Sequence, residues 1–221
     1  MTRWLIISVA LCAAAVAGCA YVGLLHPELL RERIPTHWDI AMQPDAWTDR
    51  DHYYRYLFLL PAFMAFMTVL MWLLPHISPQ GYRIEPFAGT FGYIMTVVIG
   101  FFGYLSALLV WVGMADSDLW PKFFIAGFFV FFALLGSALK SVRRNYWMGI
   151  RTPWTLSNEV VWDRTHRLAA WLWLAGGVVG GLLVLAGLPF WIGLIVLVLA
   201  ALWPAFYSLW LYKHLERLGQ L

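Results

Sequence analysis

Five long runs without a charged residue constrain the fold of this chain more than any other feature. Asp, Glu, Lys and Arg are absent from residues 4–27, 56–82, 86–115, 123–139 and 168–212. A helix needs about 20 apolar residues to cross a membrane, because it rises about 1.5 Å per residue through a hydrocarbon core about 30 Å thick. Each of the first four runs fits one crossing, and the last fits two with a turn at Gly187-Leu188-Pro189. The sequence therefore predicts an all-α polytopic membrane protein, a bundle of about six transmembrane helices.

The predicted spans cover residues 4–25, 56–75, 88–112, 121–140, 168–187 and 190–212. Two polar stretches remain between them, the first polar segment at 26–55 and the second polar segment at 141–167. We expect residues 1–87 to form an N-terminal two-helix unit that carries the first segment. Residues 88–221 would then form a four-helix core that carries the second.

The distribution of charge predicts the orientation of these spans. With the N-terminus in the cytoplasm, ten Lys and Arg residues lie inside and five outside, whereas four acidic residues lie inside and eight outside. Short cytoplasmic loops carry an excess of basic residues, so both termini are predicted to be cytoplasmic. The first polar segment would be extracytoplasmic and the second cytoplasmic. The basic excess then needs no direct contact with nucleic acid, and membrane lipid is the expected surrounding.

The first polar segment holds candidate ligand-binding residues. Its prolines restrict the backbone to extended or turn geometry, and Pro44-Asp45 is a plausible start of a turn. His37 and Asp39 lie two apart and would share a face in an extended segment. They would either hydrogen-bond the loop backbone, contribute to a binding surface, or hold a metal with Asp45 and His52. The candidates for ligand binding are His37, Trp38, Asp39, Asp45 and Trp47.

The second polar segment leads into a predicted helix that begins near residue 158, with Ser157 as its N-cap. Glu159, Asp163 and His166 share one face of that helix by their spacing. This face has three interpretations. In the first, an acidic residue of this face pairs with Arg143 or Arg151 and holds the loop in place. In the second, the face binds a cytoplasmic protein. In the third, the three side chains form a metal or catalytic site.

The two polar segments resemble a known family. The Pro-Thr-His-Trp-Asp and Pro-Asp-Ala-Trp stretches resemble an N-terminal domain of unknown function that often precedes the SdpI family core. The run from Asn145 to Thr155, with Trp162 and Thr165-His166 after it, resembles the core signature of the SdpI family of bacterial membrane immunity proteins. The chain departs from the family pattern at Met42 and Ala46, where glycines are usual.

The resemblance implies a location in the bacterial inner membrane and resistance to a secreted, membrane-active peptide toxin. It also implies signalling, in which the occupied protein recruits a cytoplasmic repressor to the membrane. The residues that match the signature, and so the candidates for contact with a cytoplasmic partner, are Asn145, Gly149, Arg151, Thr152, Pro153, Trp154, Glu159, Trp162 and His166. The resemblance supplies no catalytic residue and no cofactor, and we expect none.

Two other functions stay open at the level of sequence. A membrane-embedded metal-dependent enzyme would use Glu159, Asp163 and His166. A small-molecule permease would need a polar path through the bundle, and the absence of charged residues from the middle of every predicted span argues against ion coupling.

Overall fold

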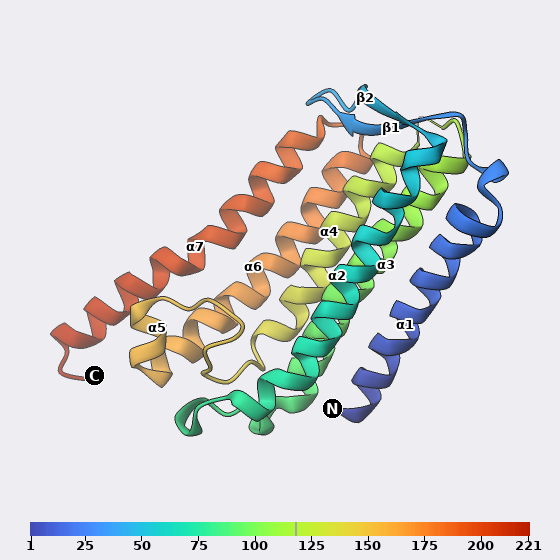
Figure 1. Cartoon of the computed structure of the whole chain (residues 1–221). Helices are drawn as coiled ribbons and strands as arrows, with labels where there is room; N and C mark the ends of the chain where they lie inside the picture. The colour runs from blue at the N-terminus through green and yellow to red at the C-terminus, as the bar shows by residue number, and fades with distance from the viewer. Residues whose placement is uncertain (118) are drawn as a thin grey trace. The chain divides into compact units, whose positions relative to one another are not determined.

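The computed structural model describes residues 1–117 and 119–221 and consists of helices with one small β-hairpin (Figure 1). The long helices are α1 (Thr2–Ala20, extended by a π-helical turn at Tyr21–Leu25), α2 (Arg50–Ile77), α3 (Ala88–Met114), α4 (Trp120–Leu139), α6 (Glu159–Leu185) and α7 (Phe190–Arg217). A short helix, α5 (Pro153–Ser157), precedes α6, and the strands β1 (Arg33–Trp38) and β2 (Pro44–Asp49) precede α2. Single 3-10 turns lie at Pro27–Leu29, Gln80–Tyr82 and Glu85–Phe87.

The six predicted spans are confirmed. Six helical segments of the described chain are long and apolar enough to cross a membrane, and each contains most of one predicted span. The predicted turn between the last two spans is also present, where Gly187 takes a φ of +86° and Pro189 caps α7. The protein is therefore a multi-pass membrane protein with an all-α bundle.

The chain forms two compact units, which divide several helices along their length. The hairpin unit comprises Thr2–Leu70 and Val98–Gly127. The signature unit comprises Met71–Val97 and Phe128–Leu221, together with Met1. Helices α2, α3 and α4 each contribute to both compact units. The expected division into an N-terminal unit and a core near residue 88 therefore stays a prediction.

Glycines of α6 allow close helix packing within the signature unit. A Cβ atom on Gly177 would lie 2.6 Å from the Phe129 carbonyl oxygen of α4, and one on Gly176 would lie 2.9 Å from Cβ of Ala200 in α7. Helix interfaces in membranes favour small residues because no hydrophobic effect draws helices together in lipid, so close backbone contact has to stabilise the packing. The glycine pattern of α6 is thus a packing feature.

The hairpin unit is organised around a small apolar core below the hairpin. Ile34 of β1, Tyr53 and Leu57 of α2 and Val112 of α3 are all buried in it. The hydroxyl of Tyr53 donates to the Leu109 carbonyl oxygen at 2.8 Å. These contacts fix the hairpin on the ends of α2 and α3.

Candidate functional site

The hairpin positions its aromatic residues through an irregular strand register. Its strands are antiparallel and pair Pro35 with Trp47 and Trp38 with Pro44. The register shifts once between Pro35 and His37 and again between His37 and Trp38. A β-bulge re-aims the side chains that follow it, because one extra residue interrupts the alternation of faces. Pro35, Trp38 and Trp47 consequently line the same cavity.

The turn of the hairpin lies at residues 39–43, so the prediction of a turn that starts at Pro44-Asp45 is wrong. Pro44 opens β2, a position where its missing N–H removes no ladder bond. Asp39 organises the turn, since its Oδ1 accepts from the backbone N–H groups of Ala41 at 2.8 Å and Gln43 at 2.9 Å. Met42 takes a φ of +61°, a left-handed conformation that favours glycine. The chain thus keeps the glycine-type turn without the glycine.

His37 and Asp45 contact each other across the hairpin. Nδ1 of His37 lies 2.6 Å from Oδ1 of Asp45, and both side chains are exposed to a large extent. An exposed pair of this kind contributes little to stability. The expected hydrogen bonds of Asp39 to the loop backbone are confirmed. The side chain of His37 instead contacts the side chain of Asp45.

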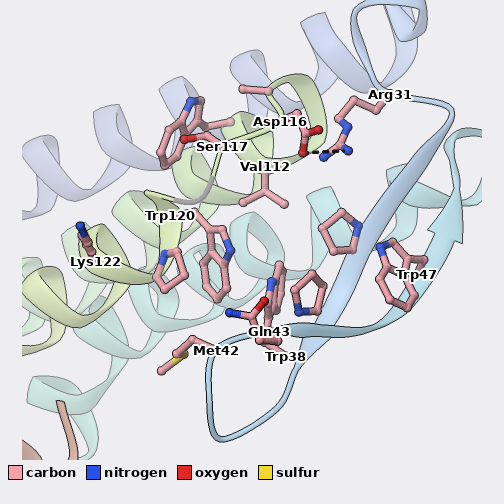
Figure 2. A pocket seen from close by; sticks show the side chains of 15 residues that line it. Arg31, Trp38, Met42, Gln43, Trp47, Val112, Asp116, Ser117, Trp120 and Lys122 are labelled. Atoms are coloured by element: carbon pink, nitrogen blue, oxygen red, sulfur yellow. Dashed lines mark ion pairs between the residues drawn. The ribbon is translucent and has the colours of Figure 1, made fainter. Parts of the chain in front are cut away.

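A cavity of about 400 Å³ opens beside the hairpin (Figure 2). Trp38 and Trp47 of the hairpin and Trp111 and Trp120 of α3 and α4 form its aromatic wall. Its polar wall contains Arg31, whose Nη2 lies 3.0 Å from Oδ1 of Asp116, and further residues including Gln43, Ser117 and Lys122. We call this the polar cavity.

A second cavity of about 370 Å³ adjoins it within the hairpin unit. Its wall is mostly apolar, and we call it the apolar cavity; its lining residues include Leu60, Leu105, Leu108, Leu109 and Phe124, with Thr36, His37 and Asp39 at the hairpin. Trp38, Met42, Val112 and Trp120 line both cavities. The rings of Trp38 and Trp120 contact each other with centroids 3.9 Å apart, tilted by 41°. This tryptophan pair is thus part of the wall of both cavities.

The second polar segment is folded by side chains that bond the backbone. Oδ1 of the buried Asn145 accepts from the N–H groups of Trp147 at 2.7 Å and Met148 at 2.9 Å. Its Nδ2 donates to the carbonyl oxygen of Arg143 at 2.8 Å. The indole N–H of Trp147 donates to Oγ of Ser78 at 2.8 Å, which anchors the turn to the end of the α2 segment.

His166 holds the centre of this segment. Its Nε2 accepts from the N–H of Ile150 at 3.0 Å, so the ring proton sits on Nδ1, which donates to the Trp162 carbonyl oxygen at 2.9 Å. Trp162 stacks on the ring with centroids 4.0 Å apart and donates its own indole N–H to the Val142 carbonyl oxygen. Protonation of the His166 ring would add a hydrogen to Nε2, and this hydrogen would point at the backbone N–H of Ile150, so the hydrogen bond between them would be lost. The site therefore favours a neutral histidine.

Gly149 is required by the position of His166. It takes a φ of +99°, and a Cβ there would lie 2.4 Å from Nε2 of His166. Both the backbone conformation and the space exclude a side chain.

Thr152 and Pro153 start helix α5, a short helix that was not predicted from the sequence. Thr152 is the N-cap, with ψ at 162°, and it forms a reciprocal capping box with Thr155, while Pro153 occupies the first turn. Oγ1 of Thr152 also lies 2.9 Å from Oγ of Ser208, which ties the segment to α7. Trp154 packs beside Val161 and Leu211.

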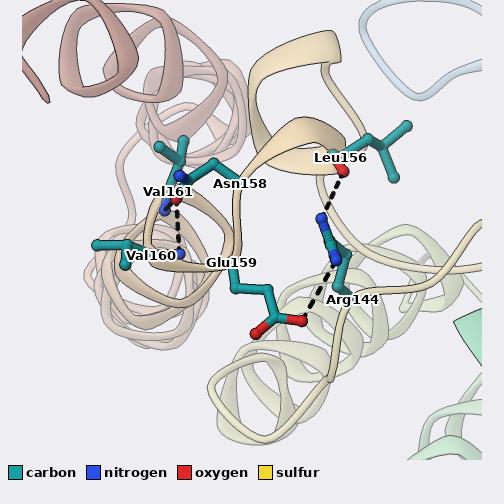
Figure 3. A network of polar contacts seen from close by, with 6 residues as sticks. All are labelled: Arg144, Leu156, Asn158, Glu159, Val160 and Val161. Atoms are coloured by element: carbon teal, nitrogen blue, oxygen red, sulfur yellow. Dashed lines mark hydrogen bonds and ion pairs between the residues drawn. The ribbon is translucent and has the colours of Figure 1, made fainter. Parts of the chain in front are cut away.

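Two details of the α6 start differ from prediction. Asn158, and not Ser157, caps α6, because its Oδ1 accepts from the N–H groups of Val160 and Val161 (Figure 3). Ser157 instead ends α5 and donates to the carbonyl oxygen of Trp154. Glu159 does pair with a basic side chain, but the partner is Arg144 at 3.3 Å and neither Arg143 nor Arg151 (Figure 3).

Arg144 and Arg151 clamp the loop from two sides. Nη1 of Arg144 donates to the Leu156 carbonyl oxygen at 3.0 Å, and its guanidinium lies 5.5 Å from the ring centroid of Tyr82. Arg151 donates to the carbonyl oxygen of Tyr146. The rings of Tyr82 and Tyr146 lie 3.9 Å apart, and the hydrogen bond between them is the main cause that raises the pKa of Tyr146.

The predicted acidic and histidine face does not form a common site. Glu159 and Asp163 are exposed, whereas His166 is buried and uses both ring nitrogens for backbone contacts. Among the described residues, no three His, Cys, Asp or Glu side chains come close enough to hold a metal ion. A metal-dependent enzyme that uses Glu159, Asp163 and His166 therefore gains no support from the geometry.

Several residues of both sites carry no local sequence signal. Trp111, Asp116 and Trp120 reach the polar cavity from helix ends and a turn far along the chain from the hairpin, and Arg31 reaches it from the segment just before β1. Ser78 and Ser208 reach the second polar segment in the same way. The position of Trp120 at a predicted span end next to Pro121 was the available hint.

Comparison with known proteins supports the resemblance seen in the sequence. Residues 141–208 match the SdpI/YfhL protein family, a range that runs from the second polar segment to Ser208 of α7. The chain is 28% identical over 182 residues to the protein named Immunity protein SdpI of Bacillus subtilis (strain 168), an alignment that covers 79% of this chain and 81% of that protein. No solved structure matches the chain.

Proposed function

We propose that this chain, whose residues 141–208 match the SdpI/YfhL protein family, is a membrane immunity protein that confers resistance to a membrane-active peptide toxin. The similarity to an immunity protein over 79% of the chain carries this proposal. That alignment is much longer than the signature and therefore includes parts of the chain outside it.

The hairpin unit offers a physical basis for binding a peptide. A cavity walled by four tryptophans adjoins an apolar cavity, and large aromatic side chains supply much of the binding energy at peptide and protein interfaces. We place toxin binding at this site, on the extracytoplasmic side, with His37, Trp38, Asp39, Asp45 and Trp47 around it.

The second polar segment supports a different role. Asn145, Gly149, Thr152, Trp162 and His166 are occupied in holding the loop against α6 and α7. This leaves the exposed side chains for a cytoplasmic partner such as a repressor, among them Tyr146, Arg151 and Glu159. We propose that signalling, where it occurs, uses these three residues.

Expression in a toxin-sensitive bacterial strain tests the immunity function. Cells that carry the chain should survive a higher dose of at least one peptide in a panel of membrane-active toxins. A Gly149→Ala variant, which disrupts the folded signature, should lose protection, and a Trp171→Phe variant at an exposed position of α6 should keep it. Unchanged killing by every peptide of the panel would reject the function.

A further inference from the structure

The indole N–H of Trp38 is a buried donor that the hairpin leaves without an acceptor. Its Nε1 has no hydrogen-bond partner among the described residues. Buried polar groups in native proteins are nearly always paired, and an unpaired donor that lines a cavity can be completed by a ligand in that cavity. This donor therefore points to an oxygen atom that arrives from outside the chain.

The location of Trp38 indicates where that oxygen would come from. Trp38 and Trp120 line both cavities, and the centroids of their rings lie 3.9 Å apart. A turn of the Trp38 ring away from Trp120 would join the polar and apolar cavities. The same turn would expose Nε1 at their junction.

The chemistry of the two cavities defines the group that fits. The apolar cavity is walled by side chains such as Leu105, Leu108 and Phe124 and suits an aliphatic or aromatic side chain. In the polar cavity, Arg31 and Asp116 neutralise each other and Lys122 remains, while Asp39 lines the apolar cavity, so the charges of the two walls balance. Segments 26–55 and 113–122 together carry eight acidic and five basic residues, which favours a cationic partner.

We infer that the two cavities form one site for a cationic amphipathic peptide. An apolar side chain of the peptide enters the apolar cavity, and the Trp38 ring leaves its contact with Trp120 and donates its indole N–H to a backbone carbonyl oxygen of the peptide. This inference rests on the proposed function and deepens it by naming the ligand class and the gate. A phospholipid, which would bring its acyl chain and an anionic headgroup, fits the acidic surroundings less well.

Photo-labelling of the purified full chain in lipid nanodiscs tests the site directly. The probe is a synthetic Lys/Leu amphipathic peptide that carries one photo-reactive leucine, and mass spectrometry maps the labelled residues. Labels should concentrate on Leu105, Leu108 and Phe124, the wall of the apolar cavity. Trp38→Phe, which removes the donor and keeps an aromatic ring, should lower the yield about tenfold, the usual effect of one hydrogen bond. Trp171→Phe is the control.

A second variant keeps the test valid if Trp38→Phe disturbs the hairpin. Leu108→Trp fills the apolar cavity and should abolish labelling there, whereas Leu182→Trp, at an exposed apolar position of α6, should not. Labels spread evenly over the apolar surface, or a yield unchanged in both cavity variants, would overturn the inference. So would labelling of this cavity by a photo-reactive phospholipid that the peptide does not displace.

The cell assay separates this inference from the proposed function. If the wild-type chain protects the cells and the Leu108→Trp and Trp38→Phe variants protect them equally well, the site is refuted and the immunity function stands. Labelling in the cavity without protection by any variant would refute the immunity function and leave the site standing.

Discussion

Replacing Gly149 by alanine should unfold the second polar segment, and its effect can be worked out from two contacts. The φ of +99° costs an alanine about 1–2 kcal/mol, as for other left-handed conformations. The new Cβ would also lie 2.4 Å from Nε2 of His166 and force the ring away. The partly buried Ile150 N–H would then lose its acceptor, which costs about 1–3 kcal/mol. The sum is about 2–5 kcal/mol of unfolding free energy.

Gly187 provides a matched control for the backbone term. It takes a φ of +86°, but a Cβ there would meet nothing within 4 Å. Gly187→Ala should therefore lose only about 1–2 kcal/mol. The difference between the two variants isolates the contact with His166.

Equilibrium unfolding in mixed detergent micelles, followed by tryptophan fluorescence, measures both variants. A double variant Gly149→Ala with His166→Ala should lose less than the sum of the single losses, because the clash disappears with the ring. Equal losses for Gly149→Ala and Gly187→Ala, or strict additivity in the double variant, would refute the account of this loop.

Three further predictions concern other parts of the chain. Met42→Gly should raise the free energy of unfolding by about 1 kcal/mol in the same assay, because Met42 sits at φ +61°; a loss would contradict the left-handed turn. Gly177→Ala should lower it by about 1–3 kcal/mol, since the new Cβ would meet the α4 backbone at 2.6 Å, while Gly181→Ala, whose nearest contact is 3.6 Å, should be near neutral. Glu159→Gln should change it by less than about 1 kcal/mol, because the carboxylate that pairs with Arg144 is 76% exposed; a larger loss would show that this pair is structural.

The spans could be predicted because lipid imposes a simple rule on the sequence. A charged residue inside the bilayer is expensive, so each crossing appears as a charge-free run. A helix extends beyond its charge-free run at places where the sequence still favours helix outside the membrane. Helix α6, for example, starts at Glu159 because Asn158 caps it there, well before the uncharged run begins at residue 168.

The hairpin could not be predicted in the same way. Pro35 and Pro44 argue against strands, since proline cannot donate to a ladder. In a sheet of only two strands, however, both strands are edges, and Pro44 stands at a strand start. The two register shifts also remove the alternation that would mark a strand in the sequence.

The chemistry of the second polar segment was partly visible in the sequence. The helix start near residue 158 and the pairing of an acidic residue with an arginine were predicted, whereas the short helix α5 at Pro153–Ser157 was not. The partner of Glu159 was not visible, because Arg144 lies 15 residues away and its position depends on how the whole loop folds. Pairing between segments depends on the tertiary fold, which local patterns do not encode.

Membrane sidedness is the central claim, because it separates ligand binding at the hairpin from any signalling at the second polar segment. Three candidate spans, α2, α3 and α4, separate these segments along the chain, and three crossings would put the segments on opposite sides. Single cysteines introduced at the exposed positions Ala46 and Ser157 can be labelled with a membrane-impermeant maleimide in intact cells, with the wild-type chain as the blank. Ala46→Cys should react in intact cells and Ser157→Cys only after permeabilisation. Reaction of both in intact cells would contradict the account.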